Sequence, residues 1–284
     1  MIPNIINPYK YFNKSDLSKY YDNNDIINYP MIISLEKDTK KYNNAEKQLK
    51  ILGFEPIKLN AIYGKDIKAK KPLLFDRFKD LNEGEIGCLL SHLTAFYIAS
   101  QHRNQDQYTI IFEDDIKIKI PIEIFKEKIS KVISYDKDFI YLGKCCEYCN
   151  NILPIDDELY TIYRPLCMHA YMVKNSFAGN IIDYINSYNI INAPIDKLIL
   201  ALSDNDNMME FHPSIVFQDL SYISNLRTKK EQLYTTHECF DKPLIIENLE
   251  SDNNMGIDGV GCNIILSISI IIIVLMVLFF IIKK

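Results

Sequence analysis

The chain has 284 residues, of which 48% are hydrophobic, and a formal net charge of −5. This length and apolar content can build a substantial core, which excludes an intrinsically disordered protein. The negative charge argues against a general nucleic-acid-binding protein, because no broad basic surface is encoded. A Lys-rich stretch at residues 65–71 is the local exception, and it fits a solvated loop, with phosphate contact as the alternative.

The first 28 residues are rich in Asn, Tyr and Asp and show no sustained hydrophobic period, which predicts a flexible leader. They also lack an apolar stretch of the length that a secretory signal needs. We expect the folded domain to occupy residues 29–223.

A strand, helix and strand follow one another at the start of this domain. Residues 31–35 form a short apolar strand, residues 40–52 have helical spacing and end at Gly53, and residues 54–59 return to a strand pattern. This βαβ order predicts a parallel sheet whose ligand crevice lies at the carboxyl ends of the strands.

A long helix is predicted to begin near residue 82. Asn82 can act as its N-cap, with Glu85 three residues later as the partner of a capping box. Ser91 and His92 lie beside the apolar stripe of this helix, so they can face the end of the sheet. The alternative for His92 is a structural histidine that only makes hydrogen bonds.

The sequence YTIIFEDDI at residues 108–116 is the strongest chemical signal. A buried strand here delivers Glu113, Asp114 and Asp115 to its carboxyl end, where burying negative charge is costly without a cation or a hydroxyl-rich ligand. Carboxylate oxygens suit Mg²⁺ or Mn²⁺, and such a metal neutralises substrate phosphates. A solvated acidic turn fits the same residues.

The rest of the domain continues to alternate between helices and strands. The pattern predicts a helix at residues 122–133, strands at 139–143 and 168–173, and helices at 176–188 and 193–202. One α/β domain accounts for this order. Residues 224–263 are polar and without a period, and are predicted to form a linker or partly ordered extension.

Residues 264–282 form a 19-residue run without a charge, followed by Lys283 and Lys284. As a helix this run is about 28 Å long, close to the hydrocarbon thickness of a bilayer, and predicts a single-pass membrane anchor. The simplest topology is tail-anchored, with a cytosolic catalytic domain on a cellular, viral or organelle membrane. The two terminal lysines favour the opposite orientation, because positive residues prefer the cytosolic side.

The seven cysteines do not form the pattern of a dense disulfide framework, and an odd number fits a reducing compartment. We expect mainly unpaired thiols. Cys146 and Cys149 have C-x-x-C spacing, and Cys167 with His169 could complete a zinc set, so structural zinc and a local disulfide stay open.

Several segments together resemble glycosyltransferase family 25, which contains lipooligosaccharide galactosyltransferases and collagen galactosyltransferase domains. They occur in family order and cover roughly residues 30–218, with GEIGCLLSH followed by IFEDD as the most specific pair. The matching segments are residues 32–35, 59–64, 81–92, 110–115, 139–143, 167–171, 194–196 and 213–218.

The resemblance implies a GT-A-like nucleotide-sugar-binding sheet and inverting transfer of a hexose, galactose or glucose, from a UDP-sugar. Asp115 is then the direct ligand of Mn²⁺ or Mg²⁺, Asp114 lies near the metal or the donor sugar, and Glu113 lies near the ribose. Inversion needs a base for the acceptor hydroxyl, and Asp196 occupies the family's Pro-x-Asp position.

Other matching residues have less specific expected roles. Ser34, Asn60 and His92 are placed at the donor, and His169 is ranked above His212 as a third metal ligand or substrate contact. The chain departs from the family after the first strand, where it offers only lysines in place of an Arg-rich nucleotide-binding segment.

The prediction is therefore a membrane-anchored, metal-dependent glycosyltransferase that acts on a glycan, glycoprotein or glycolipid. The alternative is a degenerate transferase domain that serves as a membrane-tethered binding or structural protein. Replacement of Asp114 and Asp115 separates the two hypotheses, because only an enzyme needs the carboxylates. A nucleotidyltransferase is disfavoured, since the sequence has no Gly-rich phosphate loop.

Overall fold

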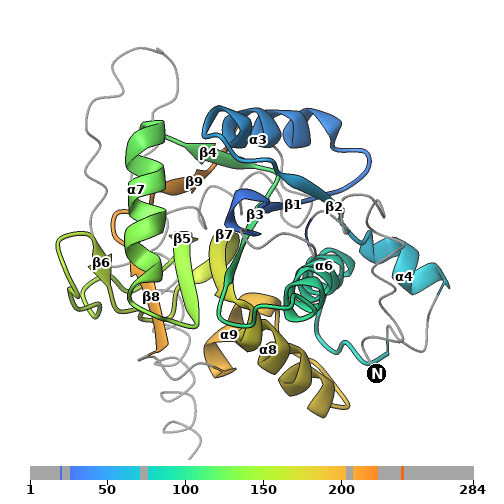
Figure 1. The fold of residues 1–284 in the computed structure, drawn as a ribbon. Coiled ribbons are helices and arrows are strands. Elements are labelled where there is room, and N and C mark those ends of the chain that lie inside the picture. The colour runs from blue at the N-terminus through green and yellow to red at the C-terminus, as the bar shows by residue number, and fades with distance from the viewer. Residues whose placement is uncertain (1–19, 21–25, 71–75, 203–206, 223–237, 240–284) are drawn as a thin grey trace, which may run out of the picture.

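The computed structural model describes residues 20, 26–70, 76–202, 207–222 and 238–239. In this part of the chain a central mixed sheet is flanked by helices on both faces (Figure 1). In chain order the elements are η2 (Ile26–Asn28), β1 (Met31–Ser34), α3 (Thr39–Ile51), β2 (Ile57–Asn60), α4 (Gly64–Lys70), α6 (Glu83–Ser100), β3 (Tyr108–Glu113), β4 (Ile116–Ile118), α7 (Ile122–Ile133), β5 (Phe139–Cys145), β6 (Leu159–Tyr160), β7 (Leu166–Lys174), α8 (Asn175–Ser187), α9 (Ile195–Leu202), β8 (Met208–Phe211) and β9 (Val216–Gln218).

The sheet has the strand order β2-β1-β3-β7-β5-β8-β6. β1 runs parallel to β2 and β3, whereas β7 runs antiparallel to β3 and β5. β5 and β8 keep the direction of β1–β3, so the all-parallel sheet predicted from the βαβ pattern is wrong at β7 and β6. No residue pattern within β7 reveals the direction in which it enters the sheet, so the local sequence could not predict this reversal.

This topology gathers distant segments at one edge of the sheet. The carboxyl ends of β1, β3 and β5 lie there, and because β7 is reversed, its amino end lies there too. The edge therefore receives Ser34, Glu113, Cys145 and Cys167, together with the loop that carries Asp114 and Asp115. Ligand sites of open α/β sheets form at such edges.

Two apolar layers hold the sheet between its helices. α6, α8 and α9 pack on one face with Ile33, Ile111 and Tyr171, and α3 and α7 pack on the other face with Ile32 and Phe112. Neighbouring strand residues contribute to opposite layers because side chains alternate across a strand. Both faces of the central strands are thus buried, as their continuous hydrophobic runs indicate.

The capping box predicted at the start of α6 is confirmed. The Asn82 side chain accepts a hydrogen bond from the Glu85 amide, and the Glu85 carboxylate accepts one from the Asn82 amide. Together they satisfy two of the amide groups that a helix amino terminus leaves open. The cap fixes the start of the helix that carries Ser91 and His92.

Two local predictions need correction. Residues 64–70 form α4 rather than a solvated loop. Part of the predicted leader belongs to the core, since Tyr20 and Ile26 are buried and the Tyr20 and Thr109 hydroxyls are hydrogen-bonded. A composition rich in Asn and Tyr did not reveal these two anchoring side chains. The rest of residues 1–25 lies outside the described residues.

The structure also corrects the prediction of unpaired thiols. Cys145 is bonded to Cys167 and Cys149 to Cys239, with Cα atoms 5.6 and 5.4 Å apart. The predicted zinc set of Cys146, Cys149, Cys167 and His169 does not form, because Cys149 and Cys167 are each consumed by a disulfide. The pairings are long-range, so C-x-x-C spacing could not reveal them.

The predicted linker at residues 224–263 touches the domain at Glu238 and Cys239, and the remainder lies outside the described residues. The predicted anchor at residues 264–282 lies outside them as well. Within the described ranges, no helix combines the length and apolar character needed to cross a bilayer. The membrane anchor therefore stays a prediction.

Candidate active site

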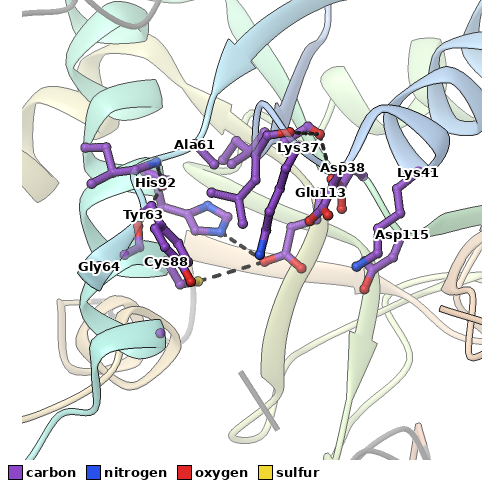
Figure 2. Close-up of a pocket in the computed structure, with 18 of the residues that line it drawn as sticks. Lys37, Asp38, Lys41, Ala61, Tyr63, Gly64, Cys88, His92, Glu113 and Asp115 are labelled. Atoms are coloured by element: carbon purple, nitrogen blue, oxygen red, sulfur yellow. Dashed lines mark hydrogen bonds and ion pairs between the residues drawn. The ribbon is translucent and has the colours of Figure 1, made fainter. Parts of the chain in front are cut away.

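A cavity of about 230 Å³ opens at the carboxyl ends of β1 and β3 (Figure 2). It is bounded by the β1–α3 loop, the β2–α4 loop, the first half of α6 and the acidic end of β3. Its lining includes Ser34, Lys37, Lys41, Tyr63, Gly64, Lys65, Cys88, Ser91, His92, Glu113, Asp114, Asp115 and Gln218. Several of the separate segments that carry the family resemblance thus meet around one space.

Asp114 and Asp115 are almost fully buried, with 8% and 6% of their surfaces exposed. The Ser34 hydroxyl donates to Asp114 Oδ2 at 2.6 Å, and the Gln218 amide donates to Asp115 Oδ2 at 2.9 Å. Asp115 Oδ1 is buried and has no hydrogen-bond partner among the described residues. A buried carboxylate oxygen without a donor is costly, and it marks this atom as a candidate ligand for a cation.

The electrostatics of the two aspartates agree with this interpretation. Burial raises the pKa of Asp115 to about 7, with a further contribution from the charge of Glu113. Burial likewise raises the pKa of Asp114 to about 6, although the Ser34 hydrogen bond and Lys41 oppose the shift. Raised carboxyl pKa values mean that the charged forms are disfavoured in this environment, so a cation that enters the cavity would stabilise them.

Glu113 has a different environment from its two neighbours. Burial favours its neutral form, but His92, His169 and Lys41 outweigh that effect and lower its pKa. His92 Nε2 lies 3.2 Å from Glu113 Oε1, and His92 Nδ1 lies 2.8 Å from the Tyr171 hydroxyl. His92 therefore faces the carboxylates, as predicted, and a Tyr–His–Glu chain joins β7, α6 and β3.

Close backbone packing shapes the wall opposite the carboxylates. A Cβ atom on Gly64 would lie 1.6 Å from the Glu83 carbonyl oxygen, and one on Gly87 would lie 2.6 Å from the Ile62 oxygen. The Ile62 amide donates to Ser91 Oγ at 2.8 Å, and Ser91 donates to the Gly87 oxygen. Glycines at these positions let α4 and α6 approach closely enough to form the cavity wall.

A second cavity, of about 330 Å³, lies beside the first and shares Gln218 with it. Lys117 of β4, Lys119 just after it and Phe217 of β9 form part of its wall, and Lys119 Nζ lies 4.7 Å from the Phe217 ring centroid. His169 also lines this cavity; its Nε2 lies 3.2 Å from the Val216 oxygen, and its buried Nδ1 has no described partner. Burial lowers the His169 pKa, which favours a neutral ring.

Not every predicted site residue lies in a cavity. Asn60 ends β2 beside Ser34, to which it is paired in the sheet, but it lines neither of the two cavities. Asp196 lies at the first turn of α9, where it accepts hydrogen bonds from the Cys167 and Lys197 amides. It also lines neither cavity, and His169 faces the second cavity rather than joining Asp114 and Asp115.

Sequence reasoning missed several residues that line the first cavity. Lys37 and Lys41 extend toward it from the β1–α3 loop and α3, and Lys37 Nζ lies 4.9 Å from the Tyr63 ring centroid (Figure 2). Their position directly after the first strand was the available signal. Gln218 and Cys88 lie within matching segments, but nothing in their spacing shows that they face the carboxylates.

The family comparison agrees with this geometry. Residues 28–199 match the model of glycosyltransferase family 25, described as an LPS biosynthesis protein family. The chain belongs to glycosyltransferase family 25. The matched range contains Ser34, His92, Asp115 and Asp196, whereas Gln218 lies beyond it. A search of the curated proteins finds no significant match.

Membership makes this protein a glycosyltransferase, whose substrates are a sugar donor and a glycan acceptor. Of the residues predicted at the donor, Ser34, His92, Glu113 and Asp114 line the first cavity, and Asn60 does not. The carboxylates at the end of β3 form the chemical centre of that cavity.

Proposed function

We propose that this family member is a metal-dependent inverting hexosyltransferase, which moves galactose or glucose from a UDP-sugar to a hydroxyl of a glycan, glycoprotein or glycolipid. The observation that carries the proposal is Asp115, a buried carboxylate with a raised pKa and an oxygen without a described partner, in the wall of a cavity. A mixed sheet with this acidic edge is consistent with a GT-A-like donor domain.

The residues present fit a hard divalent cation. Asp114 and Asp115 offer carboxylate oxygens, the ligand type that Mn²⁺ and Mg²⁺ prefer. When bound, such a metal stabilises the charge that develops on the leaving diphosphate. Ser34 and Gln218 each hold one aspartate oxygen, so the orientation of both carboxylates is fixed by the protein before any ligand arrives.

The cavity also supplies contacts for a nucleotide diphosphate. Lys37, Lys41 and Lys65 line it and carry positive charge toward the position where phosphates would lie. Lys37 and Lys41 take the place of the Arg-rich segment of the family, as point charges without the bidentate geometry of arginine. The Tyr63 ring offers a flat surface beside Lys37, to which a base or ribose can pack.

We place the acceptor in the second cavity, because Gln218 separates the two spaces and is bonded to Asp115. From this side an acceptor hydroxyl would approach the face of the sugar opposite the leaving group, as inversion requires. The base that accepts the hydroxyl proton was predicted to be Asp196, and this assignment stays a prediction. His169, buried and neutral in the wall of the second cavity, is the alternative that the geometry favours.

The cysteine pairing bears on the compartment. Two disulfides favour folding in an oxidising environment over the cytosolic placement predicted from the sequence. We infer a domain on the oxidising side of the membrane. Alkylation of the protein from intact cells, followed by mass spectrometry, tests this inference. Free thiols at Cys149 and Cys239 would restore the cytosolic placement.

The transferase proposal is tested by incubating the full chain with Mn²⁺ or Mg²⁺ and a panel of nucleotide sugars while UDP and GDP release are followed. Metal-dependent release of UDP from one hexose donor is expected, with strong loss in Asp115→Asn. Asp183→Asn, an exposed aspartate on α8, is the matched control and is expected to behave as wild type. A folded protein that neither releases nucleotide nor binds UDP would favour the tethered binding protein instead.

A further inference from the structure

The donor cavity contains a second group of metal-binding side chains, distinct in chemistry from the aspartates. Cys88 and His92 of α6 and Glu113 of β3 place their ligand atoms within 4.8 Å of one another. Glu113 Oε1 lies 3.2 Å from His92 Nε2 and 4.0 Å from Cys88 Sγ. Figure 2 shows the three side chains directed toward one point in the cavity.

The spacing along the helix explains how two of these ligands come together. Cys88 and His92 are four residues apart on α6, so they lie on one face, one turn apart. Zinc sites use the same i, i+4 arrangement of ligands on a helix. Glu113 completes the group from the sheet edge that this helix covers.

The ligand types select a particular class of cation. A thiolate sulfur, an imidazole nitrogen and a carboxylate oxygen form a mixed set that suits Zn²⁺ and discriminates against Mg²⁺ and Mn²⁺. Three protein ligands leave a fourth tetrahedral position, which in zinc proteins takes water or an exogenous ligand. All three side chains line the donor cavity, which has room for such a ligand.

The outer contacts of His92 prepare it for this role. His92 is 1% exposed, and its Nδ1 is held 2.8 Å from the hydroxyl of the fully buried Tyr171. A hydrogen bond at Nδ1 leaves Nε2 directed at the cavity and orients the ring, as partners of metal-bound histidines do. Tyr171 is in turn packed on Phe139, with ring centroids 4.8 Å apart, so the arrangement is rigid.

We propose that Cys88, His92 and Glu113 form a zinc site inside the donor cavity, and that Zn²⁺ bound there competes with the sugar donor. Binding displaces the Cys88 thiol proton, and any proton on His92 Nε2, to solvent. The competition rests on the proposed function, since it needs a donor in this cavity. The binding of zinc does not rest on it.

Cobalt titration of the full chain tests the site itself. Co²⁺ substitutes for Zn²⁺, and a thiolate ligand gives it a strong near-ultraviolet charge-transfer absorption. We expect this band in the wild type, its loss in Cys88→Ser, and its quenching by added Zn²⁺. Cys146→Ser is the matched control, because Cys146 is not disulfide-bonded and does not line the donor cavity.

Two further variants test whether Co²⁺ is bound by the three-residue site or only by the Cys88 thiol. Tyr171→Phe removes the hydroxyl beside His92 Nδ1 and is expected to weaken Co²⁺ binding about ten-fold while the band remains. Asp115→Asn is expected to leave the band in place, because Asp114 and Asp115 form a separate candidate metal site. A band that persists in Cys88→Ser, or that vanishes in Cys146→Ser, would overturn the proposal.

The competition is tested by the ratio of donor turnover with and without micromolar Zn²⁺, measured for each variant against its own zinc-free rate. We expect strong inhibition of the wild type, relieved by more donor, and at least ten-fold weaker inhibition of Cys88→Ser. Equal inhibition of both proteins would overturn the competition. If no transfer activity is found, the cobalt spectra still decide whether the site exists; if transfer occurs without a cobalt band, only the zinc site fails.

Discussion

Two regions of this molecule bury carboxylates at the same edge of the sheet. They differ in the groups that compensate the cost of burying negative charge. In the first, Lys144 at the end of β5 forms ion pairs with Glu147 and Glu210, and all three side chains are fully buried. In the second, Asp114 and Asp115 follow β3 and rely on neutral donors, with Lys41 as a weaker positive influence.

The difference separates a structural from a functional charge cluster. The Lys144 cluster contains its own cation, and the Tyr163 amide donates a further hydrogen bond to Glu147 at 2.6 Å. Glu147 also has a raised pKa, Glu210 Oε2 also lacks a described partner, and Lys144 lines the second cavity, so these features do not separate the two clusters. The difference is the partner: Lys144 forms ion pairs with both glutamates, whereas Asp114 and Asp115 accept hydrogen bonds from the neutral Ser34 and Gln218. Burial of charge alone does not identify a site, whereas burial without a matching charge beside a cavity does.

The largest expected effect is on stability, from Lys144→Met. This change leaves Glu147 and Glu210 buried without their counter-ion, and breaking such a pair from one side costs about 3–5 kcal/mol of unfolding free energy. Lys174→Met is the matched control, since Lys174 pairs with the exposed Asp136 and should lose no more than about 1 kcal/mol. Denaturant unfolding measures both, and equal losses would contradict the structural role of the Lys144 cluster.

Next in size is the effect of Asp115→Asn on activity. The substitution keeps the shape of the side chain but removes the charge, so kcat/KM is expected to fall at least about 100-fold, equivalent to about 2.7 kcal/mol of transition-state stabilisation. Steady-state UDP release over a range of Mn²⁺ concentrations provides the measurement. Full activity in this variant would show that the Asp115 carboxylate is not needed for catalysis.

The same variant should gain stability in metal-free buffer. The pKa of Asp115 is raised from 3.8 to about 7 on folding, so the folded state binds more protons and wild-type stability falls as pH rises from about 4 to about 7. The Asp115→Asn variant does not undergo this loss and is expected to be more stable than wild type by no more than about 4 kcal/mol at pH 8, with the gain shrinking toward pH 4.

Denaturant unfolding with a chelator at pH 8 and pH 4 checks this window. The opposite signs of the two results, a gain in stability and a loss of activity, are expected where a functional site has been retained at the expense of stability. A stability gain that is independent of pH would mean that the Asp115 charge is not its cause.

The smallest effect is expected from Ser34→Ala. Its hydroxyl donates to Asp114 at 2.6 Å and stabilises the charged form, so its loss should raise the pKa of Asp114 further. We expect roughly five-fold weaker Mn²⁺ binding, about 1 kcal/mol, by calorimetric titration. Ser187→Ala, which removes an exposed hydroxyl at the end of α8, is the control and should leave Mn²⁺ affinity unchanged.

Much of the site could be predicted because its signals are local. The run of β-prone apolar residues predicts β3, and the EDD triplet at its end places three carboxylates at a sheet edge whatever the rest of the chain does. The capping box fixes the start of α6, and helical periodicity then sets the face on which His92 lies. Both predictions needed only neighbouring residues.

The remaining parts of the site depend on pairings that local patterns do not contain. Gln218 reaches Asp115 across 103 positions, and Glu210 reaches Lys144 across 66. Cys149 and Cys239 are 90 positions apart. Such contacts depend on the direction in which each strand enters the sheet and on which loops share its edge.

The sequence by itself determined the α/β class, the order of the elements, the acidic end of β3 and, through its ordered motifs, the family. Only the tertiary structure decided that β7 is antiparallel, that the cysteines pair, that Lys37 and Gln218 join the aspartates, and that Asp196 stands outside both cavities. The physical reason is that propensity and periodicity act within one element, whereas packing and charge pairing act between elements that are distant in the chain.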